Sequence, residues 1–354
     1  MRVDQFVPAL HRGDAIGDTA MHMRDFLRRR GFAADIYCLE QDRDLEDEAR
    51  PFASFPAPAP EDVAILHFAL PSPLSQALTR LRCRRFIIHH NITPPEFFAP
   101  FSDEFARIAR LGRQELASLA PFVELGLADS EFNRRELAGL GFRRTDVLPL
   151  FVDFSKYKRP ANAFVQGLYR DDRMNILFVG RVAPNKKVED LIRVTFYYKK
   201  YVSPLVRLIV VGKTGALPKY YDGLVRLADE YYLKSEEIVF TGHVPDEEMF
   251  ALYRASDVFL SLSEHEGFCL PLVESMVFDL PVVAYEAGAV PETMGGAGVL
   301  LKRKRVEEVA ELVERVAHDP ALRKAVIAGQ RKRLADFKAR DLGAFLLDKL
   351  KARK

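Results

Sequence analysis

The chain has 354 residues, 48% of them hydrophobic, and its 52 basic residues nearly balance 50 acidic ones, leaving a formal net charge of +2. A chain of this length exceeds the size at which one hydrophobic core stops growing, so we expect two domains. The balanced charge argues against a nucleic-acid-binding protein, because such proteins gain affinity by neutralising phosphates with an excess of Lys and Arg.

The cysteines indicate a reducing environment. Cys38, Cys83 and Cys269 are odd in number, far apart and without CxxC spacing. With no secretory leader evident before the first expected strand, we predict a cytoplasmic protein without disulfides or zinc. No run of 18 apolar residues occurs, so no membrane span is expected, whereas scattered basic and aromatic side chains leave peripheral contact with the inner membrane face open.

Short β-rich segments alternate with helical patterns, which predicts an α/β fold with parallel sheets. The first series of expected strands covers residues 3–7, 34–39, 63–68, 86–89, 123–127 and 146–150. The second series follows a polar stretch at 157–172 and covers residues 175–179, 206–211, 238–241, 258–262, 281–284 and 298–301. We therefore predict an N-terminal domain of residues 1–158, a C-terminal domain of residues 170–335, and a helix at 336–354 that can pack back on the first domain.

A glycine-containing turn follows the first expected strand and opens a helical run at 21–30. It contains Gly13, Asp14 and Gly17. Such a turn at a helix N-terminus can bind phosphates through free backbone N–H groups. Alternatively, the glycines serve only the turn geometry and Asp14 caps the helix.

Two histidines, His89 and His90, end the strand at 86–89. Open α/β sheets bind ligands at this carboxyl edge, and because side chains alternate along a strand, only one of the two should face a ligand. A buried histidine bonded to backbone is the alternative for either one. After the next strand, Ser130 is expected to cap a helix.

Two cations follow the strand at 175–179. Gly180 and Arg181 end this strand, and Lys186 lies five positions after Arg181, before a helical pattern at 188–192. A guanidinium fork and an ammonium at a helix N-terminus suit a diphosphate. The sequence lacks GxxxxGK[ST], so this is no ATPase P-loop, and exposed surface charges are the alternative interpretation.

Glu266 and Glu274 lie eight positions apart, with Gly267 and Pro271 between them. The glycine and proline predict that Glu266 lies on a loop and Glu274 inside a helix. The backbone N–H groups of the helix start, at Gly267, Phe268, Cys269 and Leu270, carry a partial positive charge. A carboxylate beside such donors suits a sugar hydroxyl next to a phosphate, although either acid alone could be a solvated surface charge.

The order of these motifs resembles the C-terminal half of the family-4 retaining glycosyltransferases. The resemblance covers residues 175–300 and rests on Gly180-Arg181 with Lys186, on 240–244, on 256–260, on Glu266 with Glu274, and on 287–292. It implies the glycosyltransferase B fold, in which two Rossmann-like domains face each other across a cleft. The C-terminal domain of such enzymes holds most of the nucleotide sugar, and the N-terminal domain takes the acceptor.

The resemblance also implies roles for individual residues. Arg181 and Lys186 would hold the donor pyrophosphate, Glu274 the ribose hydroxyls and Glu266 the hydroxyls of the transferred sugar. Lys187 stands where many members have glycine, so the ligand could be either lysine. The further donor-binding residues it implies are Gly13, Asp14, Gly17, Gly180, Gly242, Gly267, Phe268, Cys269 and Leu270, with His90 near the reacting sugar and His89 in reserve.

The activity implied by this resemblance is retaining transfer of a hexose, mannose or glucose, from GDP-mannose or UDP-glucose to a glycan or lipid-linked acceptor, as in bacterial surface-polysaccharide assembly. No metal or other cofactor is expected, because the histidines lack metal-site spacing. Two alternatives remain open: a sugar-nucleotide epimerase or hydrolase of the same fold, and a non-catalytic protein that binds nucleotide sugars. An NAD-dependent enzyme is disfavoured because the first turn lacks GxGxxG.

Overall fold

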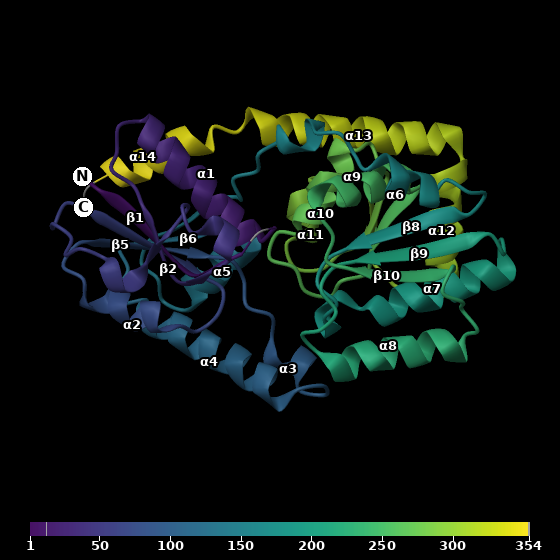
Figure 1. The fold of residues 1–354 in the computed structure, drawn as a ribbon, viewed down its shortest axis with the longest axis horizontal. Helices are drawn as coiled ribbons and strands as arrows, with labels where there is room; N and C mark the ends of the chain where they lie inside the picture. Colours follow the sequence, from purple (N-terminus) through teal and green to yellow (C-terminus); the bar gives the residue numbers. More distant parts are fainter. Residues whose placement is uncertain (12, 353–354) are drawn as a thin grey trace. The chain divides into compact units, whose positions relative to one another are not determined.

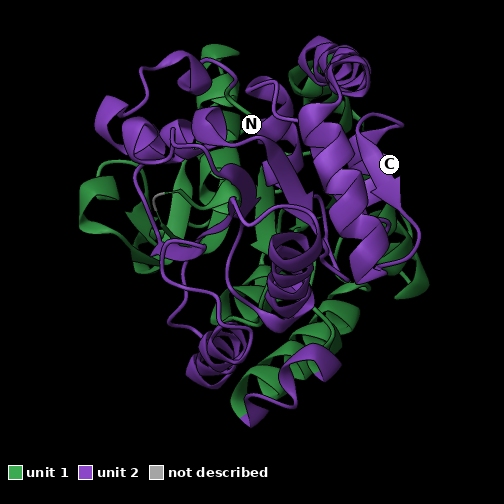
Figure 2. Cartoon of the chain, turned by 90° about the vertical axis from the view of Figure 1, so that its right-hand side faces the viewer, with its two compact units in different colours: residues 1–95, 104–153, 340–354 green, residues 96–103, 154–339 purple. Residues whose placement is uncertain are grey.

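The computed structural model describes residues 1–11 and 13–352. The chain divides into two compact units (Figure 2). The first unit consists of Met1–Pro95, Glu104–Asp153 and Arg340–Lys354, and the second of Glu96–Asp103 and Phe154–Ala339. The chain therefore passes between the units four times.

The first unit contains a seven-stranded parallel sheet in the order β3-β2-β1-β4-β5-β6-β7 (Figure 1). Its strands are β1 (Val3–Leu10), β2 (Ile36–Gln41), β3 (Arg50–Pro51), β4 (Val63–Phe68), β5 (Arg84–His89), β6 (Leu125–Ala128) and β7 (Thr145–Val147). Its helices are α1 (Ala15–Arg29), α2 (Pro73–Arg80), α4 (Asp103–Leu119), α5 (Glu131–Gly139) and α14 (Leu342–Lys351), with short 3₁₀ turns η1 (Arg43–Leu45) and η2 (Phe52–Ser54). Central strands such as β4 are buried along their whole length, which explains their continuous apolar sequence.

The second unit contains a six-stranded parallel sheet in the order β10-β9-β8-β11-β12-β13. Its strands are β8 (Met174–Val179), β9 (Val206–Val211), β10 (Ile238–Gly242), β11 (Val258–Ser261), β12 (Val282–Tyr285) and β13 (Val299–Leu301). Its helices are α6 (Ala163–Leu168), α7 (Val188–Tyr201), α8 (Pro218–Glu230), α9 (Asp246–Ala255), α10 (Leu270–Val277), α11 (Val290–Met294), α12 (Val306–His318) and α13 (Pro320–Ala339), with 3₁₀ turns η3 (Lys156–Lys158) and η4 (Pro184–Lys186).

The predicted α/β class with two parallel sheets is confirmed, and the strands at 63–68 and 206–211 have the predicted bounds. The other predicted bounds differ from the structure by up to three residues at an end, and two of the differences have a clear physical cause. The strand expected at 146–150 ends at Val147, because Pro149 has no N–H for a ladder hydrogen bond. The two-residue edge strand β3 was missed, because so short a segment has no periodicity.

The division of the chain differs from the predicted boundaries in three places. Residues 154–169 group with the second unit, where the N–H of Asn162 donates to the Glu247 carbonyl at 2.9 Å. Residues 336–339 also belong there, because α13 continues to Ala339. The segment Glu96–Asp103, which includes most of α3 (Pro95–Phe98), joins the second unit through an edge-on contact between the Phe101 and Tyr220 rings.

The C-terminal helix α14 completes the core of the first unit. Leu346 and Leu350 are at most 1% exposed, and they share one apolar cluster with Val3, Met23 and Leu27. The carbonyl groups of Leu350 and Ala352 also accept hydrogen bonds from the Arg84 guanidinium. Residues more than 300 positions apart thus build a single core.

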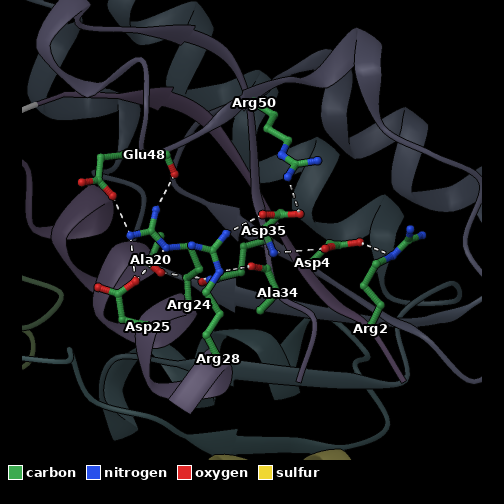
Figure 3. A network of polar contacts seen from close by, with 11 residues as sticks. Arg2, Asp4, Ala20, Arg24, Asp25, Arg28, Ala34, Asp35, Glu48 and Arg50 are labelled. Atoms are coloured by element: carbon green, nitrogen blue, oxygen red, sulfur yellow. Dashed lines mark hydrogen bonds and ion pairs between the residues drawn. The ribbon is translucent and has the colours of Figure 1, made fainter. Parts of the chain in front are cut away.

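A polar network joins α1 to the start of the sheet in the first unit (Figure 3). Arg24 is buried between Asp25 and Glu48, with Nε–Oδ1 and Nη2–Oε2 distances of 2.8 and 2.6 Å. Further along, the Asp4 carboxylate forms an ion pair with Arg2, with Oδ2 2.8 Å from Nε, and its Oδ1 accepts from the Asp35 N–H at 3.2 Å. Asp4 is only 2% exposed, and this burial raises the pKa of its carboxyl from 3.8 to about 6.

Asp4 makes the first unit less stable as pH rises. Between pH 4 and 6 the folded state binds a proton that the unfolded state has lost, so the free energy of unfolding falls with pH by about 3 kcal/mol for a shift of about two pKa units. In Asp4→Asn this fall should disappear, as measured by urea unfolding between pH 4 and 7. The exposed Asp47→Asn should keep the wild-type pH dependence, and an unchanged slope in Asp4→Asn would contradict this prediction.

Candidate active site

Three neighbouring strands of the second unit, β8, β9 and β10, end in or are followed directly by a glycine, and at Gly212 the close approach of the turns requires it. The N–H of Gly180 donates to Val211 and that of Gly212 to Gly242, each at 2.9 Å. Gly212 has a φ of +146°, and a Cβ built there would lie 2.1 Å from the Gly180 carbonyl oxygen. Only glycine therefore allows the ends of β8 and β9 to come this close.

The two lysines after β8 point to different partners. Lys186 ends η4, and its Nζ lies 2.7 Å from both carboxylate oxygens of Glu266. Lys187 has a left-handed backbone with a φ of +53°, a conformation that glycine adopts more readily. The Nζ of Lys187 lies 3.3 Å from Glu264 and 3.6 Å from Glu189. Of the two lysines, Lys186 is the one that contacts Glu266.

The backbone around Glu266 is held from two sides. On one side, Asn185 donates from Nδ2 to the His265 carbonyl at 3.0 Å and accepts the Glu264 N–H at 2.8 Å. On the other, the Ala289 N–H donates to the Glu266 carbonyl at 2.9 Å. The Glu266 side chain is 6% exposed, so its carboxylate is fixed in a largely desolvated position beside Lys186.

As predicted, Glu266 precedes a helix and Glu274 lies inside it. The helix α10 begins at Leu270, and Cys269 before it has a left-handed backbone with a φ of +66°. Phe268 is buried, and its carbonyl accepts a hydrogen bond from Thr293 Oγ1. Burial, and then the charge of Glu266, raises the pKa of the Cys269 thiol well above its usual value, which disfavours a nucleophilic thiolate at this position.

Glu274 lies between two tyrosines. Tyr157 of η3 donates to Oε1 at 2.9 Å and Tyr253 of α9 donates to Oε2 at 2.8 Å. Burial raises the pKa of Glu274, and the two hydroxyl donors partly oppose the shift. Each carboxylate oxygen has a second acceptor position, so the two tyrosines do not exhaust the capacity of Glu274.

Arg181 differs from Lys186 in its environment. Its side chain is exposed, and among residues 1–11 and 13–352 no ion pair holds its guanidinium. The structure therefore pairs one of the two expected pyrophosphate cations with Glu266 and leaves the other solvated.

Both glycines of the turn in the first unit have a structural explanation, whereas the predicted capping role of Asp14 is not found. Gly13 has a φ of +72°, and a Cβ on Gly17 would lie 3.0 Å from Leu10 Cδ1 and 3.3 Å from the His11 carbonyl oxygen. Asp14 occupies the N-cap position of α1, but its side chain makes no capping bond. Ser130, in contrast, caps α5 as predicted by accepting the Asn133 N–H at 3.2 Å.

Both candidate histidines of the first unit are buried and bonded to side chains rather than to backbone. His90 contacts Asp129 through Nδ1 and His67 through Nε2, each at 2.9 Å, and its side chain is 2% exposed. His89 points to the other face of the sheet and contacts Glu136 through Nε2 at 2.9 Å. Since both nitrogens of His90 are engaged within the unit, this ring has no free nitrogen for a substrate proton.

Several site residues were missed by sequence reasoning. Tyr157 and Tyr253 donate to Glu274, and Asn185 holds the backbone beside Glu266, but each contact joins residues far apart in the sequence, by up to 117 positions. Asn185 lies next to Lys186 inside the recognised motif, which is the only signal that could have identified it. Within the described residues there is no cluster of His, Cys, Asp or Glu able to hold a metal ion, and no helix is long and apolar enough to cross a membrane.

Gly288 is predicted to be essential to the Glu266 loop. Its φ is +55°, and a Cβ there would lie 2.4 Å from the Glu266 carbonyl oxygen. Gly288→Ala should lower the free energy of unfolding by about 2 kcal/mol or more through strain and displacement of the loop. Gly223→Ala, in the interior of α8 with no close atom at the Cβ position, should instead raise it by up to about 1 kcal/mol. Equal effects of the two substitutions in urea unfolding would refute the role of Gly288.

Glu274 also makes the free energy of unfolding depend on pH. Because its pKa is raised in the folded state, its contribution to stability is full below the unfolded pKa, near 4.5, and falls as pH rises towards the folded pKa. Glu274→Gln removes this fall, so the stability of the variant relative to wild type should increase from pH 4.5 upward. Exposed Glu311→Gln should show no such trend in the same unfolding series. A pH-independent difference between Glu274→Gln and wild type would argue against a buried, proton-binding carboxyl.

Comparison with known families agrees with this geometry. Residues 161–333 match the family described as glycosyl transferases group 1. The chain is 26% identical over 146 residues to the serotype-specific mannosyltransferase WbdA of Escherichia coli, a match covering 41% of this chain and 18% of WbdA. It is 30% identical over 210 residues to the D-inositol 3-phosphate glycosyltransferase of Mycobacterium bovis, covering 58% of this chain and 42% of that protein. These matches thus span less than half the length of either relative.

Solved structures show the same fold. The Anabaena protein HepE in complex with UDP and glucose superposes with a TM-score of 0.74 at 20% identity, covering 99% of both chains. WaaG, a glycosyltransferase involved in lipopolysaccharide biosynthesis, gives a TM-score of 0.71 at 14% identity over 99% of this chain and all of the other. The glycosyltransferase B fold is therefore confirmed, and within it residues 161–333 form a domain of the glycosyl transferases group 1 family.

Proposed function

We propose that this protein transfers a hexose from a nucleotide-diphosphate sugar to a hydroxyl of a glycan or lipid-linked acceptor, with retention at the anomeric carbon. The contact between Lys186 and Glu266 is the observation that carries this proposal. It places a cation suited to a diphosphate next to a carboxylate suited to sugar hydroxyls, four residues before the N-terminus of α10.

The relatives support the same class of donor and product. One similar protein is named a mannosyltransferase and another a D-inositol 3-phosphate glycosyltransferase. The HepE structures contain UDP-glucose or its parts, UDP and glucose. Mannose and glucose are therefore the hexoses that we propose, with GDP or UDP as the nucleotide.

In the proposed reaction, the donor diphosphate takes Lys186 and Arg181 as its cationic partners. Glu266 then accepts hydrogen bonds from hydroxyls of the transferred sugar, and Glu274 from the ribose, each as an orienting acceptor. Cations beside the diphosphate stabilise the negative charge that develops as the bond from the anomeric carbon to phosphate oxygen breaks. This charge stabilisation lowers the barrier to departure of the nucleoside diphosphate.

The acceptor hydroxyl attacks from the face that the diphosphate leaves. Its oxygen forms the new bond to the anomeric carbon, and its proton passes to the departing phosphate oxygen. This route requires no protein nucleophile, in keeping with the raised pKa of Cys269 and with the two occupied nitrogens of His90. Because Arg181 and Lys186 supply the positive charge, we also propose that transfer continues in the presence of a metal chelator.

Removal of either partner of the central ion pair should abolish most transfer. Lys186→Ala and Glu266→Gln should each lower kcat/KM by about 100-fold or more, because each removes a group aimed at the donor. Lys187→Ala is the matched control, since the adjacent ammonium pairs with Glu264 and Glu189, and it should retain activity within a few-fold of wild type. The measurement is release of the nucleoside diphosphate with and without an acceptor.

Wild-type rates in both Lys186→Ala and Glu266→Gln would exclude this site as the active site. Release that does not depend on an acceptor would indicate a hydrolase instead of a transferase. Binding of the donor without turnover by any acceptor would favour a non-catalytic nucleotide-sugar-binding protein.

A further inference from the structure

Four polar side chains form a row across one face of the first sheet. Gln5, His67, His90 and Asp129 come from or directly follow β1, β4, β5 and β6, which are neighbours in this order. The strand register pairs Gln5 with Ile65 and His67 with Ile88, so alternation along the strands places the four side chains on the same face. All four side chains are buried: Gln5 is fully buried, His67 is 1% and Asp129 5% exposed, and the side chain of His90 is 2% exposed.

Each member of the row contacts the next. Gln5 Oε1 lies 2.9 Å from His67 Nε2, His67 Nδ1 lies 2.9 Å from His90 Nε2, and His90 Nδ1 lies 2.9 Å from Asp129 Oδ2. The two imidazole planes differ by 7°, and their centroids are 5.1 Å apart. That separation exceeds the nitrogen–nitrogen distance by about two ring radii, so the rings meet edge to edge along an N–H···N bond and are not stacked face to face.

The direction of every hydrogen bond in the row follows from its first member. Gln5 Nε2 donates to the Ala20 carbonyl at 2.9 Å, which fixes the amide so that Oε1 faces His67. An amide oxygen only accepts, so the proton of His67 must be on Nε2. Burial, followed by the charge of His90, lowers the pKa of His67 well below its usual value, so this ring is neutral and its Nδ1 is an acceptor.

The same reasoning determines the protonation of His90. Because His67 Nδ1 accepts, His90 must donate from Nε2. A proton is then also needed between His90 Nδ1 and Asp129 Oδ2, since neither a bare ring nitrogen nor a carboxylate oxygen is a donor. An imidazole is more basic than a carboxylate, so this second proton belongs to the ring.

We propose that His90 is held as an imidazolium paired with the Asp129 carboxylate, and that Gln5 and His67 are positioning residues that impose this state through the direction of their hydrogen bonds. The pair is then neutral overall, as burial requires. Without the second proton, Asp129 would be a buried anion with no cation to balance it, and its Oδ1 has no hydrogen-bond partner among residues 1–11 and 13–352.

The test is nitrogen-15 NMR of the histidine rings of the full chain at pH 7.5, with His90 assigned by the signal lost in His90→Asn. We expect both His90 nitrogens to be protonated in the wild type and His67 to be the neutral Nε2–H form. In Gln5→Leu, His67 can move its proton to Nδ1, so His90 should become neutral. Gln5→Glu should preserve the imidazolium, because a buried protonated carboxyl donates to Ala20 and accepts from His67 as the amide does.

Asp129→Asn provides a second variant if Gln5→Leu does not fold, since the asparagine N–H can donate to His90 Nδ1 and should leave His90 neutral. A neutral His90 in the wild type, or an imidazolium that persists in both Gln5→Leu and Asp129→Asn, would overturn the proposal. These spectra require no donor, so they stay informative if the proposed transferase activity fails.

Discussion

The ion pair between Lys186 and Glu266 is the interaction on which the rest of the second unit's site depends. It joins residues 80 positions apart in a largely desolvated place, where two charges are stable only if their geometry is good and further hydrogen bonds support them. Asn185 and the Ala289 N–H give that support to the backbone on either side. The loops after β8 and β11 are thereby fixed relative to each other before any substrate arrives, which is the preorganisation that electrostatic catalysis requires.

Backbone strain accumulates around this pair. Lys187 and Cys269 have left-handed conformations without being glycine, and Gly288 has one where a side chain would strike Glu266. Such conformations persist only where the surrounding structure determines them, and they concentrate at functional sites. Lys187, Cys269 and Gly288 each lie at one end of a short segment that presents a charged or N–H group to the site. The strained backbone at these three residues therefore orients those groups.

The local backbone structure of the site could be predicted from the sequence, but the contacts between its side chains could not. Gly267 and Pro271 predicted that Glu266 lies on a loop and Glu274 in a helix, because their backbone effects are local. Tyr157 and Tyr253 could not be linked to Glu274, since their contacts depend on how η3, α9 and α10 pack. The expectation that only one of His89 and His90 faces a ligand followed from strand alternation, yet both rings are buried against side chains from other strands and helices. Strand bounds were predicted best where the whole segment is buried and mostly apolar, as in β4 and β9, and worst at the edge, as in β3 and β7.

The central claim is that Lys186 binds the diphosphate and Glu266 binds the sugar. Calorimetry with UDP and UDP-glucose, and with GDP and GDP-mannose, tests this directly on the nucleotide pair that binds. Lys186→Ala should weaken the nucleoside diphosphate and its sugar alike, by about tenfold or more, which corresponds to about 1.4 kcal/mol. Glu266→Gln should weaken only the nucleotide sugar, because the free nucleoside diphosphate lacks the hexose whose hydroxyls this carboxylate binds. Equal losses for both ligands in Glu266→Gln, or no loss for either in Lys186→Ala, would contradict the account.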